Sequence, residues 1–387
     1  MRVTRLAVAV AFLALALALG LSVPRAEAAA CGKVVGPFTQ KNAQIFQSNG
    51  GLYVPLGATI SGLERTGYAN FHDSDMAEID AAAAWCANTV RFQVTEQHIN
   101  DPGVLDALEA YVQHAEALGL VVVINDNDEW DSPDTPMPTA RTKTFWATVA
   151  PIYKNDPQVV FDIFNEPRSH PGWPCWHDGG QACVTAKGWQ GIVGMNTLAK
   201  YVRSLAPNNL IWIDGPDTQL DRVARTFSPQ AVADNETQSL AGASHYPIYG
   251  VRPMMYSIHH PTGPHTIANW RTQFGWIAEQ HYAPVADGEW TNFAANRGEC
   301  WSDAPQRVPA YLSYLEKLGI GMTVWKLGAW DQPGTTSGVV TAMDPTVPTG
   351  FGVWSQWKCQ DGYPHSAGVK IKAWYEKLNS SALATST

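Results

Sequence analysis

The chain of 387 residues lacks several patterns that define large classes of enzymes and binding proteins. No Cys-x-x-Cys pair occurs, so the sequence gives no support to zinc-ribbon or thioredoxin-type sites. No Gly-x-Gly-x-x-Gly follows the first apolar run, which disfavours a dinucleotide-binding domain. No Gly-x-Ser-x-Gly is present either, which disfavours a serine hydrolase with a nucleophile elbow.

Linkers and excess positive charge are also missing. No Ser/Thr/Pro-rich stretch, charge block or low-complexity tract divides the chain, so we expect a single domain without an appended binding module. Lys and Arg total 26 against 35 Asp and Glu, which gives a net charge of −9. An acidic surface disfavours nucleic acid and anionic membranes as partners, because both are themselves negatively charged.

The first 28 residues have the pattern of a secretory signal peptide. Arg2 and Arg5 precede an apolar run over residues 6–21, and a small-x-small cleavage site ends at Ala28. We therefore expect a mature chain of residues 29–387 that is secreted and extracellular. The leader carries three arginines and one glutamate, so its removal changes the net charge from −9 to −11.

Two other interpretations of the leader are weaker. An uncleaved membrane anchor is disfavoured because no stop-transfer charges follow the apolar run. Cleavage before a lipid-modified Cys31 is disfavoured because only alanines precede that cysteine directly. No later segment is apolar for long enough to span a bilayer, so we expect no stable membrane association.

Strands and helices are expected to alternate along the rest of the chain. Short runs rich in apolar and β-branched residues recur eight times, with longer helical segments between them. One such segment, residues 104–118, places its apolar side chains on one face, and Gly119 is expected to end the helix. Eight strand–helix units favour an α/β fold of the (β/α)8 TIM-barrel type over an open sheet. The expected strands are 54–60, 88–94, 120–126, 159–165, 210–215, 254–260, 283–289 and 321–327.

Two glutamates lie where expected strands end. The fourth strand ends in Phe-Asn-Glu-Pro-Arg, which places Glu166 at the rim, and the seventh ends in Gly-Glu-Trp, which places Glu289 there. In a barrel of this type the carboxyl ends of all strands meet at one mouth, where the chemistry takes place. Two carboxylates in one cleft are what glycosidic hydrolysis requires, because one protonates the leaving oxygen and the other attacks the anomeric carbon.

These motifs resemble glycoside hydrolase family five, the cellulase family, over most of the expected mature chain. The ordered series is Val-Arg-Phe, Phe-Asn-Glu-Pro-Arg, Tyr-Ser-Ile-His-His and Gly-Glu-Trp. The resemblance implies a retaining double displacement with Glu166 as acid/base and Glu289 as nucleophile. It further implies substrate-site roles for Arg91 near the nucleophile, Asn165 at the sugar 2-hydroxyl, His259 near the nucleophile and Trp325 beneath the sugar.

Two positions depart from the family pattern. The family's tyrosine two residues beyond the strand-six histidine is replaced by Pro261, and Tyr256 or Tyr246 are the candidates for supplying a hydroxyl instead. The family's histidine at the end of strand three has no counterpart, and Asn127 lies nearest to its place. These departures indicate a divergent branch and leave the sugar contacts open.

Other polar clusters have simpler interpretations. His259 and His260 are adjacent on an expected strand and so point to opposite faces, which disfavours a metal cluster with His265. The run 125–129 lacks the glycine and final glutamate of a calcium loop, and we interpret it as a polar loop at the cleft. The stretch 168–184 is interpreted as a wall of the cleft, with Trp173 or Trp176 as sugar platforms or as packed residues.

The sequence therefore predicts a retaining hydrolase of a β-linked glycan, foremost an endo-β-1,4-glucanase. A β-mannanase or exo-β-glucosidase of the same family is the alternative. A carbohydrate-binding protein that kept the fold and lost the reaction is the alternative from another class. No cofactor or metal is expected, nor an appended carbohydrate-binding module, and the oligomeric state is left open.

The six cysteines all follow the leader, and an even number in an exported chain favours disulfides. Cys175 and Cys183, eight residues apart, are the best candidates for a pair. We expect the exported, oxidised protein to show no free thiol when a thiol reagent is added under denaturing conditions. Six titratable thiols would instead show that the cysteines are unpaired.

Overall fold

The computed structural model describes most of the chain after the leader. The fold is that of the compact unit Gly32–Thr387. The leader 1–28 lies outside the described residues, as do Cys300 and Cys359. The described residues are 31–63, 74–127, 137–167, 172–216, 240–259, 267–290, 304–325, 327 and 367–384.

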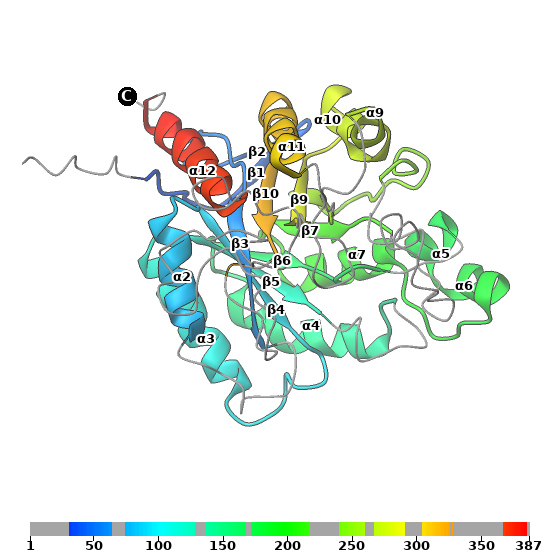
Figure 1. Ribbon diagram of the computed structural model, residues 1–387. Coiled ribbons are helices and arrows are strands. Elements are labelled where there is room, and N and C mark those ends of the chain that lie inside the picture. Colours follow the sequence, from blue (N-terminus) through cyan, green and yellow to red (C-terminus); the bar gives the residue numbers. More distant parts are fainter. Residues whose placement is uncertain are drawn as a thin grey trace, which may run out of the picture. The chain divides into compact units, whose positions relative to one another are not determined.

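Eight parallel strands form a closed barrel, as the alternation of strands and helices predicted (Figure 1). Each strand pairs with the next along the chain, and the eighth pairs with the first. The strands are β3 (Leu56–Leu63), β4 (Thr89–Val94), β5 (Val121–Asp126), β6 (Val159–Asp162), β7 (Ile211–Asp214), β8 (Met254–Ile258), β9 (Val285–Trp290) and β10 (Gly321–Val324).

Helices follow the strands and cover the outside of the barrel (Figure 1). The helix expected over 104–118 spans Val104–Ala117, and Gly119 directly after it has φ +82°, a conformation that favours glycine. The described helices are α2 (Ser74–Ala84), α3 (Val104–Ala117), α4 (Ala140–Tyr153), α5 (Trp173–Asp178), α6 (Gly180–Lys187), α7 (Met195–Leu205), α9 (Ile267–Trp270), η3 (Arg271–Gly275), α10 (Trp276–Glu279), α11 (Ala304–Leu318) and α12 (Ala367–Ala384). Of these helices, not one has the length and apolar character needed to cross a membrane.

The segment before the first barrel strand covers the amino-terminal end of the barrel. It contains a hairpin of β1 (Thr39–Lys41) and β2 (Gln44–Phe46), which was not predicted. The Tyr53 hydroxyl lies 3.0 Å from Thr89 Oγ1 at the start of β4, and Gln40 accepts a hydrogen bond from the amide of Met254 at the start of β8. The carboxyl-terminal end of the barrel is therefore the end left for chemistry.

The apolar layer inside the barrel continues into that segment. Val121, Val123 and Val160 from β5 and β6 form one buried cluster with Phe38 and Tyr53. The β-branched residues of the strands thus fill the amino-terminal half of the barrel interior. Polar side chains line the interior nearer the carboxyl ends of the strands.

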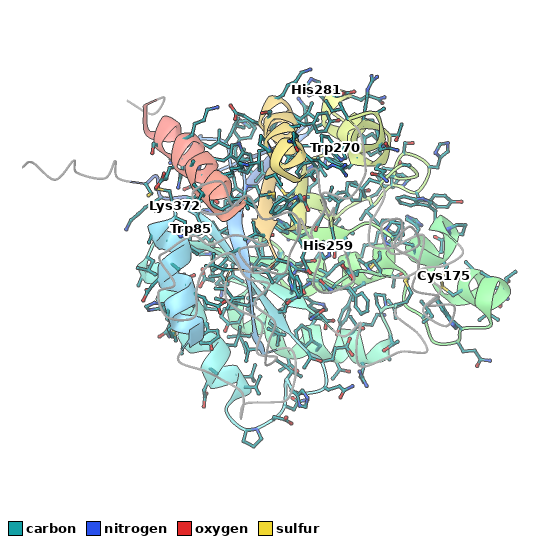
Figure 2. The ribbon with its side chains drawn as sticks, viewed as in Figure 1. Trp85, Cys175, His259, Trp270, His281 and Lys372 are labelled. Atoms are coloured by element: carbon teal, nitrogen blue, oxygen red, sulfur yellow. A yellow bond between two sulfur atoms is a disulfide. The ribbon has the colours of Figure 1, made fainter. Side chains whose placement is uncertain are left out.

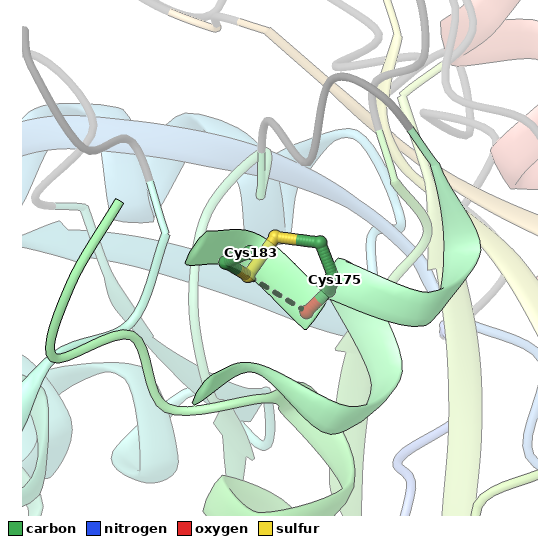
Figure 3. Close-up of a disulfide and its surroundings, with 2 residues drawn as sticks. All are labelled: Cys175 and Cys183. Carbon is green, nitrogen blue, oxygen red and sulfur yellow. Dashed lines mark hydrogen bonds between the residues drawn. A yellow bond between two sulfur atoms is a disulfide. The ribbon is translucent and has the colours of Figure 1, made fainter. Parts of the chain in front are cut away.

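The predicted pair Cys175–Cys183 forms a disulfide between α5 and α6 (Figure 3). The two cysteines are eight positions apart in the sequence, and both are buried. Cys31 and Cys86 are disulfide-bonded as well. No cysteine in the described part of the chain is free.

The last helix is tied to the seam where the barrel closes. The buried hydroxyl of Tyr375 on α12 lies 2.6 Å from the carbonyl oxygen of Gly57 on β3 and 3.0 Å from that of Met322 on β10. These strands are the first and last of the barrel, so one phenol links both sides of the seam.

We expect Tyr375→Phe to lower the free energy of unfolding by about 1–2 kcal/mol, because the single buried O–H that two carbonyl oxygens share is lost while the ring stays packed. Urea denaturation followed by circular dichroism measures the change, with kcat as a check that the site is intact. An unchanged urea midpoint would show that the seam does not depend on this hydroxyl.

Candidate active site

Polar side chains from five barrel strands meet at the carboxyl-terminal end of the barrel. They come from the ends of β4, β6, β7, β8 and β9, and His259 from the end of β8 is labelled in Figure 2. A carboxylate oxygen of Glu166, a ring nitrogen of His259 and a carboxylate oxygen of Glu289 all lie within 4.8 Å of one another. The prediction that both glutamates lie at one end of the barrel is confirmed.

Arg91 is fully buried and joins three of these strands. Its Nε donates to Asp162 at 2.8 Å, its Nη1 to Glu289 at 2.8 Å and its Nη2 to Asn165 at 2.6 Å. The planar fork of the guanidinium suits such a set of oxygen acceptors, which a lysine could not contact together. The predicted proximity of Arg91 to Glu289 is confirmed, and Asp162 is a partner that the sequence did not reveal.

Glu166 lies directly beyond β6 in a backbone conformation that is rare for a residue with a side chain. Its φ is +43°, whereas Asn165 before it is held by a hydrogen bond from its amide to the carbonyl of Asp126. The amide of Glu166 donates to Asp214 Oδ2 at 3.1 Å. Left-handed backbone of this kind is found mainly where the surroundings enforce it, often at functional sites.

Glu289 lies near the end of β9, with a side chain that is 13% exposed. Besides Arg91, it accepts a hydrogen bond from Gln93 Nε2 at 3.3 Å. Gly288 before it has no room for a side chain, because a Cβ there would lie 2.2 Å from Ser257 Oγ. The glycine of the Gly-Glu-Trp motif thus lets β9 lie close to β8.

Burial raises the pKa of Glu289 to about 7, although the nearby charges of His259 and Arg91 act to lower it. Arg91 was expected to keep this carboxyl ionised. It does oppose protonation, but desolvation is the larger effect. Burial likewise raises the pKa of Asp162 to about 7, with a further contribution from the negative charge of Asp214.

His259 lies among three carboxylates. Its Nδ1 is 3.0 Å from Glu166 Oε1 and 3.7 Å from Glu289 Oε2, and its Nε2 is 3.2 Å from Asp214 Oδ2. Burial acts to lower the pKa of His259, but the negative charges of Asp214, Glu289 and Glu166 outweigh it and raise this pKa to about 10. The ring is therefore an imidazolium at neutral pH.

Glu166, His259 and Glu289 are also the group of three potential metal ligands found among the described residues. A histidine must lose its proton to bind a metal ion, and the raised pKa of His259 opposes that. The same side chains are better suited to proton transfer and nucleophilic attack.

The aromatic residues predicted around the site differ in burial and in their contacts. Trp325 directly follows β10, is partly buried against the hydrophobic core, and its amide donates to the carbonyl of Trp290 at the end of β9; its predicted place beneath the sugar stays a prediction. Trp176 is fully buried, so its interpretation as a sugar platform is wrong. Trp173 is partly buried and stacks on Tyr246, with ring centroids 6.1 Å apart.

Tyr256 and Asn127 were among the candidates to replace the family's strand-six tyrosine and strand-three histidine. Tyr256 belongs to the buried core, and its hydroxyl accepts a hydrogen bond from the amide of Ile248. That phenol packs in the core and bonds to backbone there. Asn127 is buried at the end of β5, while Pro261, His260 and His265 lie outside the described residues.

The polar run 125–129 was interpreted as a loop, although its first two residues also belong to the strand predicted over 120–126, and for them it is the strand prediction that is confirmed. Asn125 and Asp126 are the last residues of strand β5 and are fully buried. Asn125 Nδ2 donates to the carbonyl of Asp162 at 3.4 Å. Asp128 and Glu129 lie outside the described residues.

Comparison with known families decides the identity of this site. The cellulase family, glycosyl hydrolase family 5, matches residues 56–331, which include every barrel strand. The chain belongs to glycosyl hydrolase family 5. It is therefore a glycoside hydrolase of a retaining family.

Individual relatives of this family 5 hydrolase are distant. It is 25% identical to endoglucanase N of Pectobacterium atrosepticum and to endoglucanase 5 of Pectobacterium carotovorum, in each case over 142 residues, or 36% of this chain. The aligned part spans about a third of the length of these curated relatives, 31% and 27% respectively.

Solved structures share the fold. An endocellulase from Pyrococcus horikoshii in complex with cellotetraose superposes with a TM-score of 0.61 at 16% identity, covering 87% of this chain and 98% of that one. The catalytic domain of an endoglucanase from Thermobifida fusca superposes with a TM-score of 0.58 at 18% identity, covering 88% and 97%.

Removing the charge of Arg91 should raise the pKa of Glu289 further. We expect Arg91→Ala to lower kcat/KM at pH 7 by about 100-fold or more, similar to the loss of one strong donor at a reacting centre, and to shift the acid limb of the pH profile upward. Arg91→Lys keeps the charge and should keep the acid limb close to that of the unmodified enzyme.

The matched control is Arg271→Ala, which removes an exposed arginine bonded to Glu279 at 2.6 Å and should leave the profile unchanged. Thermal unfolding checks that the Arg91 variants fold, because a lost partner leaves Asp162 and Glu289 uncompensated. Near-normal activity of Arg91→Ala at neutral pH would show that Arg91 is purely structural.

Proposed function

We propose that this protein is an exported, retaining endo-β-1,4-glucanase, with Glu166 as acid/base and Glu289 as nucleophile. The observation that carries the proposal is the spacing of the two carboxylates at one barrel mouth, where one oxygen of Glu166 lies within 4.8 Å of one oxygen of Glu289. Retaining glycosidases have their carboxyl groups roughly 5–5.5 Å apart, whereas inverting enzymes need roughly 6.5–9.5 Å to admit a water molecule between them.

The reaction proceeds in two displacements. Glu166 donates its proton to the glycosidic oxygen while the bond from that oxygen to the anomeric carbon breaks, and Glu289 attacks the carbon to form a glycosyl-enzyme. A water molecule then attacks the same carbon and gives its proton to Glu166, and the Glu289 carboxylate is released. The proton that left Glu166 is thereby restored.

The surrounding bonds support these roles. Arg91 and Gln93 both donate to Glu289 Oε2, which favours the ionised form that attack requires. Arg91 also binds the amide oxygen of Asn165, so the amide nitrogen of Asn165 is the atom oriented for the sugar 2-hydroxyl. His259 contacts Glu166 directly, and Trp325, directly after β10, is the aromatic residue proposed to lie beneath the sugar.

The substrate class is supported by the relatives. Both curated relatives are named endoglucanases, and the Pyrococcus horikoshii endocellulase is described in complex with cellotetraose. Export is supported by the leader pattern and by the disulfide-bonded cysteines.

A substrate panel tests the glucanase proposal. We expect reducing sugar from carboxymethylcellulose and mixed-linkage β-glucan, with a fall in viscosity early in the reaction, because an endo-acting enzyme cuts within the polymer. Release from mannan alone would replace glucanase by mannanase, and slow viscosity loss with glucose as first product would indicate an exo-β-glucosidase. Binding to glucan without any release would favour the inactive carbohydrate-binding protein.

Product stereochemistry tests the roles of the two glutamates. We expect proton NMR of cellotetraose hydrolysis to show the β anomer first, because two displacements restore the configuration. Glu289→Ala should be nearly inactive, and azide should then yield an α-glycosyl azide. Glu166→Ala should cleave an activated aryl glycoside, and azide should then yield a β-glycosyl azide.

The matched control is Glu316→Ala, which removes a surface glutamate paired with Lys377 and should retain full activity. An α anomer as the first product would show inversion, and both role assignments would then be wrong.

A further inference from the structure

Asp214 is a buried carboxylate that the motifs of the sequence did not identify. It is the last residue of β7 and is fully buried. Its Oδ2 accepts a hydrogen bond from the amide of Glu166 at 3.1 Å and lies 3.2 Å from His259 Nε2. One carboxylate oxygen therefore contacts both the backbone of Glu166 and the histidine that contacts its side chain.

We propose that Asp214 is a positioning residue for Glu166, acting through the Glu166 backbone and through His259. The inference rests on the proposed acid/base role of Glu166. Its contacts with the Glu166 amide and with the His259 ring are the two arms through which it acts on the reaction.

The first arm fixes the backbone. Glu166 has a φ of +43°, a conformation that a residue with a Cβ rarely adopts without support. The hydrogen bond from its amide to Asp214 anchors that peptide to β7. The direction in which the Glu166 side chain leaves the backbone therefore depends on Asp214.

The second arm fixes the carboxyl group. With Asp214 at Nε2 and Glu166 at Nδ1, both ring nitrogens of His259 face acceptors, so the ring is oriented and doubly protonated. The other groups that face this ring electrostatically are Glu289 from β9 and Asp162 from β6. The imidazolium donates to Glu166 Oε1 and so sets the plane of that carboxyl.

The position of Asp214 is itself secured from the other side. Its carbonyl oxygen accepts a hydrogen bond at 3.0 Å from Nε1 of Trp176, which is fully buried. Trp176 lies on α5, next to the disulfide between Cys175 and Cys183. The disulfide-linked segment that contains Trp176 thus helps to hold Asp214 in place, which gives buried Trp176 a role other than sugar binding.

Two substitutions separate the two arms. Asp214→Asn keeps an oxygen that can accept from the Glu166 amide but removes the charge that faces His259. Asp214→Ala removes both. We expect kcat/KM for cellotetraose to fall about 10-fold in Asp214→Asn and about 100-fold in Asp214→Ala, within the contribution of a general acid. For 2,4-dinitrophenyl β-cellobioside, whose leaving group needs no proton, both should fall less than about threefold.

The pH profile distinguishes positioning from a loss of stability. Without the charge of Asp214, the pKa of His259 falls, since that charge is the largest influence that raises it. The charge of Asp214 also raises the pKa of Glu289 directly, while Glu289 and Glu166 still favour a protonated ring, so the acid limb of kcat/KM should move to lower pH in Asp214→Asn. Tyr375→Phe, which weakens the seam between β3 and β10 and removes no charge, should leave the limb in place.

Glu166→Ala is the reference that separates this proposal from the proposed function. If it loses cellotetraose activity but keeps activity on the aryl glycoside, Glu166 is the acid. An Asp214→Asn variant with the rate ratio and acid limb of the unmodified enzyme would then overturn the role of Asp214 alone. If Glu166→Ala shows no preference for the activated substrate, the proposed function fails and the role of Asp214 with it.

A measurement on the unmodified protein covers the case in which the Asp214 variants do not fold or cellotetraose is not cleaved. Nitrogen-15 NMR of the histidine rings, with His259 assigned by its loss in His259→Gln, should show His259 doubly protonated at pH 8. A neutral His259 ring at that pH would overturn the proposed pairing with Asp214.

Discussion

The buried fork of Arg91 is the interaction on which the rest of the site depends. One guanidinium bonds a carboxylate from β6, an amide just beyond β6 and a carboxylate from β9. A buried charge is tolerated only when its partners are close and its hydrogen bonds are made, and here all three donor groups of the fork are used. The cation thereby fixes how the ends of three strands face one another across the mouth of the barrel.

Around this cation, burial and nearby charges have opposite effects on the pKa values of the carboxyl groups. In the part of the chain that the structure describes, Arg91 and His259 are the cations facing Glu166, Glu289, Asp162 and Asp214, so carboxyl groups outnumber these cations there. Desolvation raises the pKa of both Glu289 and Asp162 to about 7. The cluster therefore carries less negative charge near neutral pH than its carboxyl groups could hold, and the bonds from Arg91 and Gln93 are what favour the ionised form of Glu289.

The sequence predicted the barrel and the paired glutamates because both depend on local patterns. Buried parallel strands are recognisable apolar runs, and a glutamate after Phe-Asn or Asp-Gly at the end of such a run is placed by the topology alone. The single pair Cys175–Cys183 was predicted because its spacing is short.

Asp214, Asp162 and Gln93 were missed because their importance arises from contacts between strands that are distant in sequence. An aspartate at an inward-facing position of the run Leu-Ile-Trp-Ile-Asp-Gly was the available signal for Asp214, but no spacing links it to His259. The burial of Trp176 was equally hidden, since a tryptophan in a polar stretch is typical of both a sugar platform and a packed wall. Loop positions outside the regular pattern therefore remained ambiguous.

The hydroxyl of Tyr375 has a consequence for how the chain acquires its fold. It joins α12 to Gly57, 318 residues earlier in the sequence, and to β10 beside it. Contacts of such long range form late, because the closure of a long loop carries a large entropic cost. Until the last helix is available, the seam between the first and last strands lacks this link, so the closure of the barrel belongs to the late steps of folding.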